Sequence, residues 1–186
     1  MEEELNSTTK ENEIDIDSII ENLDEEKAQE FYEKSSAEAE DILKDEDKME
    51  RFFQKLEKKL KTVPVAGTVL AYVPLMMSLV RSYVKKEYTE PPITSMISIV
   101  VALIYFLSPV DLIPDIVPGA GYVDDAVVIS GCLALIRTDL EDYRIWRKNQ
   151  GLELDDIPDY EEIAKEATSN NKFASAFFKG RKSVQK

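Results

Sequence analysis

Apolar and polar positions divide the chain into segments with different expected structures. Between residues 14 and 60, apolar side chains recur at helical spacings of three and four, with Phe52, Phe53 and Leu56 among the most regular. The earlier half of this stretch carries so much negative charge that its helices should be marginal on their own. From about Asp41 onward, the pattern predicts a better amphipathic helix.

Two later stretches contain no charged residue. Residues 62–80 and 91–110 each approach the roughly 20 residues that are needed to cross about 30 Å of hydrocarbon. A polar connector, residues 81–92, separates them and ends in the helix-stopping pair Pro91 and Pro92. The pattern predicts a helical hairpin.

Two interpretations of this hairpin stay open. It either enters a membrane, spanning it or dipping into one leaflet, or forms the centre of a small soluble helical bundle, because hydropathy alone does not separate the two. Tyr83, Tyr105 and Trp146, near the ends of apolar segments, favour the membrane interpretation. We therefore expect membrane association and leave the number and orientation of spans open.

After the hairpin, apolar residues between residues 126 and 146 recur at alternating intervals of three and four, which predicts one helix with an apolar stripe. Its charged residues begin only at Arg137, so we expect one end to be buried and the other to emerge into water. Residues 149–186 form a polar tail with a basic and aromatic end.

The net charge of −14 is concentrated at one end of the chain. Residues 1–50 hold 20 acidic and 5 basic residues, whereas residues 51–62 hold 5 basic residues and 1 acidic residue. So acidic a chain is a poor partner for nucleic acid, and a basic block within it suits a local anionic surface such as a bilayer. The candidate surface residues are Arg51, Lys55, Lys58, Lys59 and Lys61. A solvated helix face is the alternative explanation.

These patterns divide the chain into an acidic, partly disordered or marginally helical arm (residues 1–50), a helical domain (51–148) and a polar tail (149–186). The expected fold class is all-α. The domain should combine the membrane-associated hairpin with a helix-turn-helix segment that is rich in Pro, Gly and Asp.

That segment spans residues 105–128, and helix capping explains much of it. Ser108 can cap a helix whose first position is Pro109, and a carboxylate at Asp111 then meets free backbone amides. Asp124 and Asp125 likewise stand where the last helix should begin. Between the two helix starts, turn residues prevent one continuous helix; among them are Pro114, Pro118, Gly119 and Gly121.

Capping leaves Asp115 unexplained. No Lys, Arg or His occurs between residues 91 and 136, so clustered carboxylates in apolar surroundings need backbone amides, protons or a cation. Oxygen ligands alone suit Mg²⁺ or Ca²⁺. The candidate ligands are Asp111, Asp115, Asp124 and Asp125. Docking of another protein on the Asp-rich turns is the third alternative.

Enzymatic activity is not expected. The chain has no histidine and no glycine loop that cradles phosphate, and it has no Ser or Cys beside a suitable base. Its single cysteine, Cys132, lies in an apolar run, which predicts a buried structural thiol.

Several residue types recur in a fixed order across the Asp-rich segment: Tyr105, Ser108, Pro109, Asp111, Leu112, Ile113, Pro114, Asp115, Pro118, Gly121, Tyr122, Asp124 and Asp125. This order resembles the YkvA-like family, a bacterial and plant domain of unknown function, over roughly residues 65–137. The resemblance implies a small helical domain that is embedded in a membrane, and it supplies no activity and no catalytic residues.

We therefore expect a bacterial cytoplasmic-membrane protein that serves as a structural or interaction module and has the bilayer as its partner. No cofactor is expected unless Mg²⁺ or Ca²⁺ binds the aspartates. If the soluble alternative holds, the protein is a cytoplasmic bundle that binds another protein.

Overall fold

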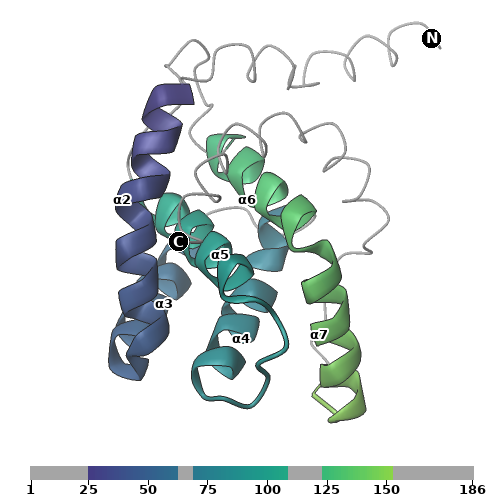
Figure 1. Ribbon diagram of the computed structural model, residues 1–186. Coiled ribbons are helices and arrows are strands. Elements are labelled where there is room, and N and C mark those ends of the chain that lie inside the picture. The colour runs from purple at the N-terminus through teal and green to yellow at the C-terminus, as the bar shows by residue number, and fades with distance from the viewer. Residues whose placement is uncertain (1–24, 63–68, 109–122, 153–186) are drawn as a thin grey trace, which may run out of the picture.

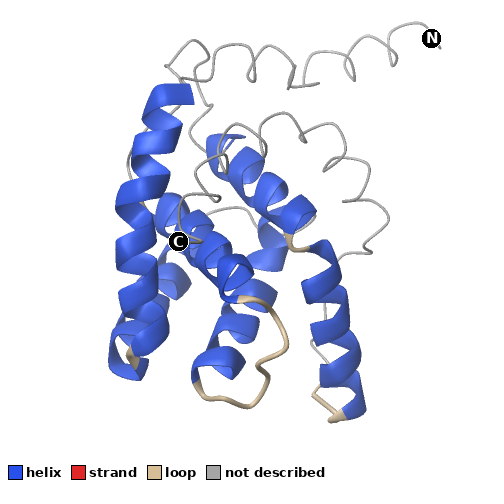
Figure 2. Cartoon of the chain, in the orientation of Figure 1, coloured by secondary structure: helices blue, strands red, loops and turns tan. Residues whose placement is uncertain are grey.

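The computed structural model describes residues 25–62, 69–108 and 123–152, and every regular element in these ranges is a helix (Figures 1 and 2). This confirms the all-α fold class. The α-helices are α2 (Glu25–Lys44), α3 (Glu46–Leu60), α4 (Val73–Val84), α5 (Ile93–Leu107), α6 (Val123–Leu135) and α7 (Arg137–Asn149). A short 3-10 helix, η1 (Val69–Tyr72), precedes α4.

Helix α5 is the centre of the fold. It is apolar on all sides, and each of its residues from Ser95 to Phe106 is buried. Helices α2, α3, α4 and α6 all contact it, as expected for a helix without a polar face. The second charge-free run of the sequence therefore forms the core element around which the other helices are arranged.

Helices α2 and α3 lie side by side along one flank of α5 (Figure 1). Helix α2 is highly charged, yet it buries Ala28, Tyr32, Ala39 and Ile42 on the side that meets the core. Packing of this kind stabilises a helix that charge repulsion alone would leave marginal. The expected boundary between residues 50 and 51 falls inside α3, and the division into arm and domain stays a prediction.

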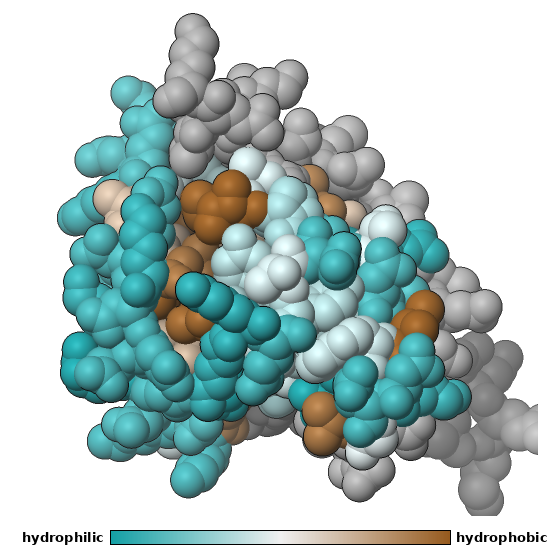
Figure 3. Space-filling view, turned by 60° about the horizontal axis from the view of Figure 1, so that its bottom comes forward, coloured by the Kyte–Doolittle hydropathy of each residue, from teal (hydrophilic) through white to brown (hydrophobic). Residues whose placement is uncertain are grey.

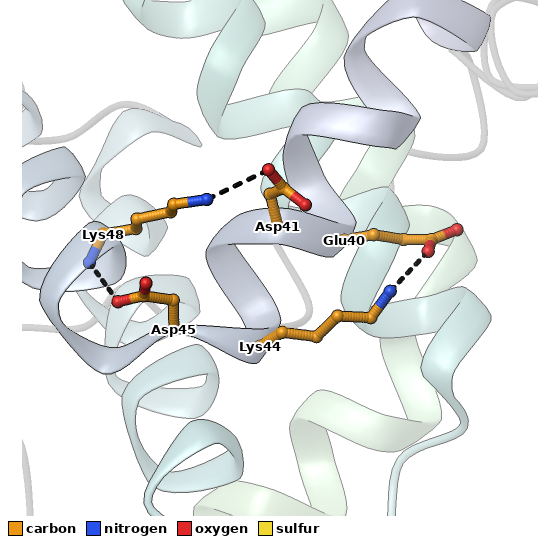
Figure 4. A network of polar contacts seen from close by, with 5 residues as sticks. All are labelled: Glu40, Asp41, Lys44, Asp45 and Lys48. Atoms are coloured by element: carbon orange, nitrogen blue, oxygen red, sulfur yellow. Dashed lines mark hydrogen bonds and ion pairs between the residues drawn. The ribbon is translucent and has the colours of Figure 1, made fainter.

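A polar corner joins α2 to α3 (Figure 4). Asp45 separates the two helices, and its side chain accepts a hydrogen bond from the backbone N–H of Lys48 at 2.9 Å, which caps the start of α3. The Lys48 ammonium also pairs with Asp41 of α2 at 3.0 Å, and Lys44 pairs with Glu40. The pair of Lys48 with Asp41 joins the two helices across the turn, whereas the pair of Lys44 with Glu40 lies within α2.

The first charge-free run does not form one continuous helix in the described residues. Its residues 63–68 lie outside them, η1 follows, and α4 begins at Val73 with Pro74 in its first turn. Helix α4 then continues beyond the run to Val84. It contacts α5, the helix that follows the polar connector. Proline suits the first turn because its missing N–H has no partner there.

The transmembrane helix that the sequence predicts is not found in the described residues. No helix in residues 25–62, 69–108 or 123–152 combines the length and the apolar character that crossing a bilayer requires. Helix α5 has the most uniform apolar character, but its 15 residues extend only about 22 Å at roughly 1.5 Å per residue.

The single helix predicted between residues 126 and 146 is in fact two helices, α6 and α7, that meet at Ile136. Ile136 closes one helix and opens the next, because its N–H donates to the Cys132 carbonyl of α6 and its carbonyl accepts from the Leu140 N–H of α7. The bend falls where the sequence changes from apolar to charged. It lets α6 stay against the core while α7 turns its polar face to water.

Helices α4 and α7 end in the same way. In each, the chain turns through a residue of positive φ, Lys86 (φ 60°) after α4 and Gly151 (φ 70°) after α7. The following N–H groups return to the last turn: Glu87 N–H donates to the Ser82 carbonyl, and Leu152 N–H donates to the Arg147 carbonyl. Both ends are Schellman motifs, and glycine occupies the left-handed position only in the second.

Candidate functional site

The candidate site is the solvent-facing side of α3. Arg51, Lys55 and Lys58 follow one another at intervals of four and three, which places them on one stripe of the helix, and all three are exposed. Lys61, just beyond the helix, is exposed as well. We call Arg51, Lys55, Lys58 and Lys61 the basic stripe.

The opposite side of α3 carries Met49, Phe52, Phe53 and Leu56, all buried in the core. The apolar residues therefore fix the rotation of the helix, and that rotation presents the basic stripe to the outside. Sequence periodicity alone predicts this division, and the structure confirms it for these residues.

The basic stripe is an unfavourable arrangement for an isolated helix. Arg51 and Lys55 are four residues apart, and Lys58 follows Lys55 by three, so like charges face each other along the stripe at a cost of a few tenths of a kcal/mol per pair. Within the described residues, none of the four stripe side chains makes an ion pair. Lys58 lies in the last turn and suits the helix dipole, whereas Arg51 and Lys55 lie too far from it to benefit.

Lys59, the fifth predicted surface cation, has a different environment. It is half-buried, its ammonium donates a hydrogen bond to the Phe106 carbonyl, and it lies 4.4 Å from the centre of the Phe106 ring. A cation at this place meets the negative end of the α5 dipole. Lys59 thus joins α3 to the end of the central helix.

The flank of α3 beside the basic stripe is tied to α4. Glu50 accepts two hydrogen bonds from the Arg81 guanidinium, at 3.0 and 3.2 Å, and this bonding lowers the pKa of the Glu50 carboxyl. Lys85 lies 3.6 Å from Glu46. These acidic residues are therefore engaged with α4 and do not neutralise the basic stripe.

Most of the Asp-rich segment lies outside the described residues. This applies to Pro109, Asp111, Pro114, Asp115 and Gly121. Asp124 and Asp125 belong to the first turn of α6, but their side chains also lie outside the description. The capping, cation and docking hypotheses for these residues stay predictions.

Among the candidate site residues of the Asp-rich segment, Ser108 is the one whose backbone and burial the structure describes. Its backbone is extended (φ −75°, ψ 143°), which is the conformation that a following proline favours. Its N–H donates to the Ile104 and Tyr105 carbonyls and so ends α5. In the described part of the chain, no three His, Cys, Asp or Glu side chains gather in a group that would hold a metal ion.

The face where α4 and α7 end is mostly hydrophilic, with small separate groups of hydrophobic residues (Figure 3). Ile93, Ile145 and Leu152 are about half exposed. Isolated apolar residues are normal on a protein surface. Attraction to a lipid surface would therefore depend on charge rather than on an apolar patch at this end.

Comparison with known proteins supports the resemblance found in the sequence. Residues 95–131 match a family described as Protein of unknown function (DUF1232). Over 78 residues the chain is 27% identical to the Uncharacterized membrane protein YkvA of Bacillus subtilis (strain 168), which is 42% of this chain and 74% of that protein. Together the two matches confirm the likeness to the YkvA-like family, and neither description names an enzymatic activity. No solved structure matches the chain.

Proposed function

We propose, from the likeness of this chain to an uncharacterized membrane protein, that it is a helical interaction module that associates with the anionic surface of the bacterial cytoplasmic membrane. In this proposal the basic stripe of α3 meets the lipid headgroups. The compact helical core holds the stripe in place.

The observation that carries this proposal is the row of like charges on α3. Arg51, Lys55 and Lys58 repel one another on an exposed helix face, and among the described residues no carboxylate pairs with them. An anionic headgroup layer would attract each of these side chains and so offset the repulsion between them. Each Lys or Arg near such a surface contributes about 1 kcal/mol.

The test is co-sedimentation with vesicles of phosphatidylcholine, with and without phosphatidylserine. We expect the protein to bind the vesicles that contain phosphatidylserine at low salt and to leave them at high salt, because exposed charges are screened over about 10 Å at 0.1 M salt. The triple variant Arg51→Gln, Lys55→Gln, Lys58→Gln should bind on the order of 100-fold more weakly, from about 1 kcal/mol per residue.

A matched control removes the same charge elsewhere. Lys34, Lys86 and Lys148 are exposed and lie outside α3, so the triple variant Lys34→Gln, Lys86→Gln, Lys148→Gln should keep most of the binding. Equal loss in the two triple variants would mean that net charge, and not the basic stripe, decides binding. If wild-type protein binds vesicles with and without phosphatidylserine equally at every salt concentration, the bilayer-surface proposal is wrong. A soluble protein-binding bundle then becomes the better proposal.

A further inference from the structure

A pocket of about 510 Å³ opens between α3, α4 and the end of α7. It does not include the basic stripe: α3 contributes only Glu57 and Leu60 to the lining. Apolar walls come from both α3 and α4, and basic side chains come from α4, the turn after it and α7. The residues used below are Ser78, Arg81, Lys85, Glu87 and Arg147.

Arg147 is the distinctive group of this pocket. Its Nε donates to the Leu152 carbonyl at 2.8 Å, and its Nη1 donates to the Ser78 hydroxyl at 2.5 Å and to the Tyr143 hydroxyl at 3.3 Å. All of these partners are neutral oxygens. Within the described residues no carboxylate pairs with Arg147, and its Nη2 makes no hydrogen bond.

The guanidinium is held rigidly. The Tyr143 hydroxyl also lies 2.8 Å from Ser78 Oγ and 3.0 Å from Ser82 Oγ, so one network connects α7 to α4. Behind it, the Tyr143 ring stacks on Trp146, and both rings contact Tyr88. A cation fixed in this way needs little reorganisation to bind an anion, which improves affinity.

The other charges of the pocket set the size of the ligand. Arg81 is paired with Glu50, and Lys85 has only a longer contact with Glu46 at 3.6 Å. Glu57 and Glu87 also line the pocket and oppose a highly charged anion. One unpaired Arg, one loosely held Lys and a serine hydroxyl suit a small oxyanion with one or two negative charges.

We propose that this pocket is a binding site for a small oxyanion of the phosphate or phosphate-monoester class, with Arg147 as the main anchor, Ser78 beside it and Lys85 at the rim. The guanidinium donors that remain on Arg147 form charge-assisted hydrogen bonds with the ligand. The site goes beyond the membrane-surface proposal and does not depend on it, because the basic stripe is not part of the pocket.

The test is thermal unfolding of the full chain in rising concentrations of inorganic phosphate at constant ionic strength. A ligand that binds only the folded state raises the melting temperature in proportion to the logarithm of its concentration above the dissociation constant. We expect this rise in wild type. Arg147→Gln should weaken the apparent phosphate affinity at least tenfold.

Arg144→Gln is the matched control, since Arg144 lies on the same helix, outside the pocket, and has only a 3.9 Å contact with Glu141. It should keep the wild-type response. If Arg147→Gln does not fold, Lys85→Gln provides the second variant, because Lys85 is exposed, and the apparent affinity should then fall several-fold. A wild type that gives no phosphate-dependent shift, or variants that respond like wild type, would overturn the proposal.

Two sources of the phosphate group can be separated. Vesicles with phosphatidic acid that compete with inorganic phosphate identify a lipid headgroup, whereas phosphate binding unchanged by such vesicles identifies a free phosphate compound. Both outcomes support the pocket. The triple variant of the basic stripe should bind inorganic phosphate like wild type, so that failure of the membrane-surface proposal leaves this result intact.

Discussion

The Arg81 guanidinium holds the Glu50 carboxylate through two hydrogen bonds, at 3.0 and 3.2 Å, and thereby fixes α4 to α3. The same guanidinium lies 5.1 Å from the centre of the Phe53 ring, so the ion pair covers the edge of the core. Both side chains are slightly more than a third exposed, and this exposure to solvent limits the strength of the pair.

We expect Glu50→Gln to lower the free energy of unfolding by about 0.5–1 kcal/mol at neutral pH. Hydrogen bonding to Arg81 lowers the pKa of Glu50 from its ordinary value of 4.5. The stabilisation is therefore complete well above pH 4.5 and is lost as the pH falls through the lower, folded-state pKa. Urea denaturation of both proteins at several pH values measures the difference, and a difference that grows below pH 4.5 would contradict the assignment.

The positive φ of Lys86 predicts a stabilising substitution. Lys86→Gly should raise the free energy of unfolding by up to about 1 kcal/mol, because an L-residue in the left-handed region is strained by roughly 1–2 kcal/mol and glycine is not. For a chain of this size the melting temperature should rise by about 2–4 °C.

The converse change at the end of α7 is the comparison. A Cβ at Gly151 would meet no atom within 4 Å, so Gly151→Ala tests backbone strain without a steric clash. It should lower the melting temperature by a similar amount. If both substitutions shift stability in the same direction, the two helix ends are not equivalent Schellman motifs in solution.

Packing of α2 on α5 predicts where the N-terminal arm can be shortened. Deletion of residues 2–24 keeps all described helices and should leave the unfolding transition cooperative. Deletion of residues 2–44 removes Tyr32, which is 1% exposed, and uncovers one side of the apolar α5. We expect this longer deletion to aggregate or unfold, and Tyr32→Ala alone to lower the free energy of unfolding by about 3 kcal/mol or more. Circular dichroism melts of the three proteins make the comparison.

The shorter deletion also tests a regulatory role of the arm. Residues 2–24 contain nine acidic residues and one lysine, and these charges can compete with anionic lipid for the basic stripe. Without them, binding to vesicles with phosphatidylserine should strengthen at low salt and change little at high salt. Unchanged binding at both salt concentrations would assign the arm a solvating role only.

The aspartates outside the described residues yield a separate prediction. If a cation binds Asp115 and Asp124, millimolar Mg²⁺ or Ca²⁺ should raise the melting temperature of wild type in a concentration-dependent way, and Asp115→Asn or Asp124→Asn should abolish the rise. If the aspartates only cap helices, both variants are destabilised and the ion has no effect. A wild type that does not respond to either ion ends the cation hypothesis.

The sequence predicts the local features of this fold well. The apolar run that became α5 is continuous, and the apolar face of α3 repeats at helical spacing, so both are visible without a structure. The bend at Ile136 cannot be seen in this way, because no Pro or Gly lies at or directly beside it. There the change in composition decides where the helix turns.

Contacts between residues that are far apart in the sequence could not be predicted, for a different reason. Arg147 and Ser78 are 69 positions apart, and neither stands in a recognisable pattern. The burial of Tyr32 against the core likewise follows from the arrangement of α2 and α5, while the local sequence indicates only a charged, marginal helix. The pocket therefore could not have been predicted, whereas the basic stripe could.

Because Cys132 is buried, the reactivity of its thiol reports how often the helical core opens. This single thiol is fully buried in α6, and its Sγ lies 3.5 Å from the Ser98 carbonyl of α5. A thiol reagent can reach it only when α6 moves away from the elements that cover it, α5 among them. The labelling rate, measured with and without vesicles, gives the frequency of that opening and shows whether a lipid surface loosens or tightens the helical core.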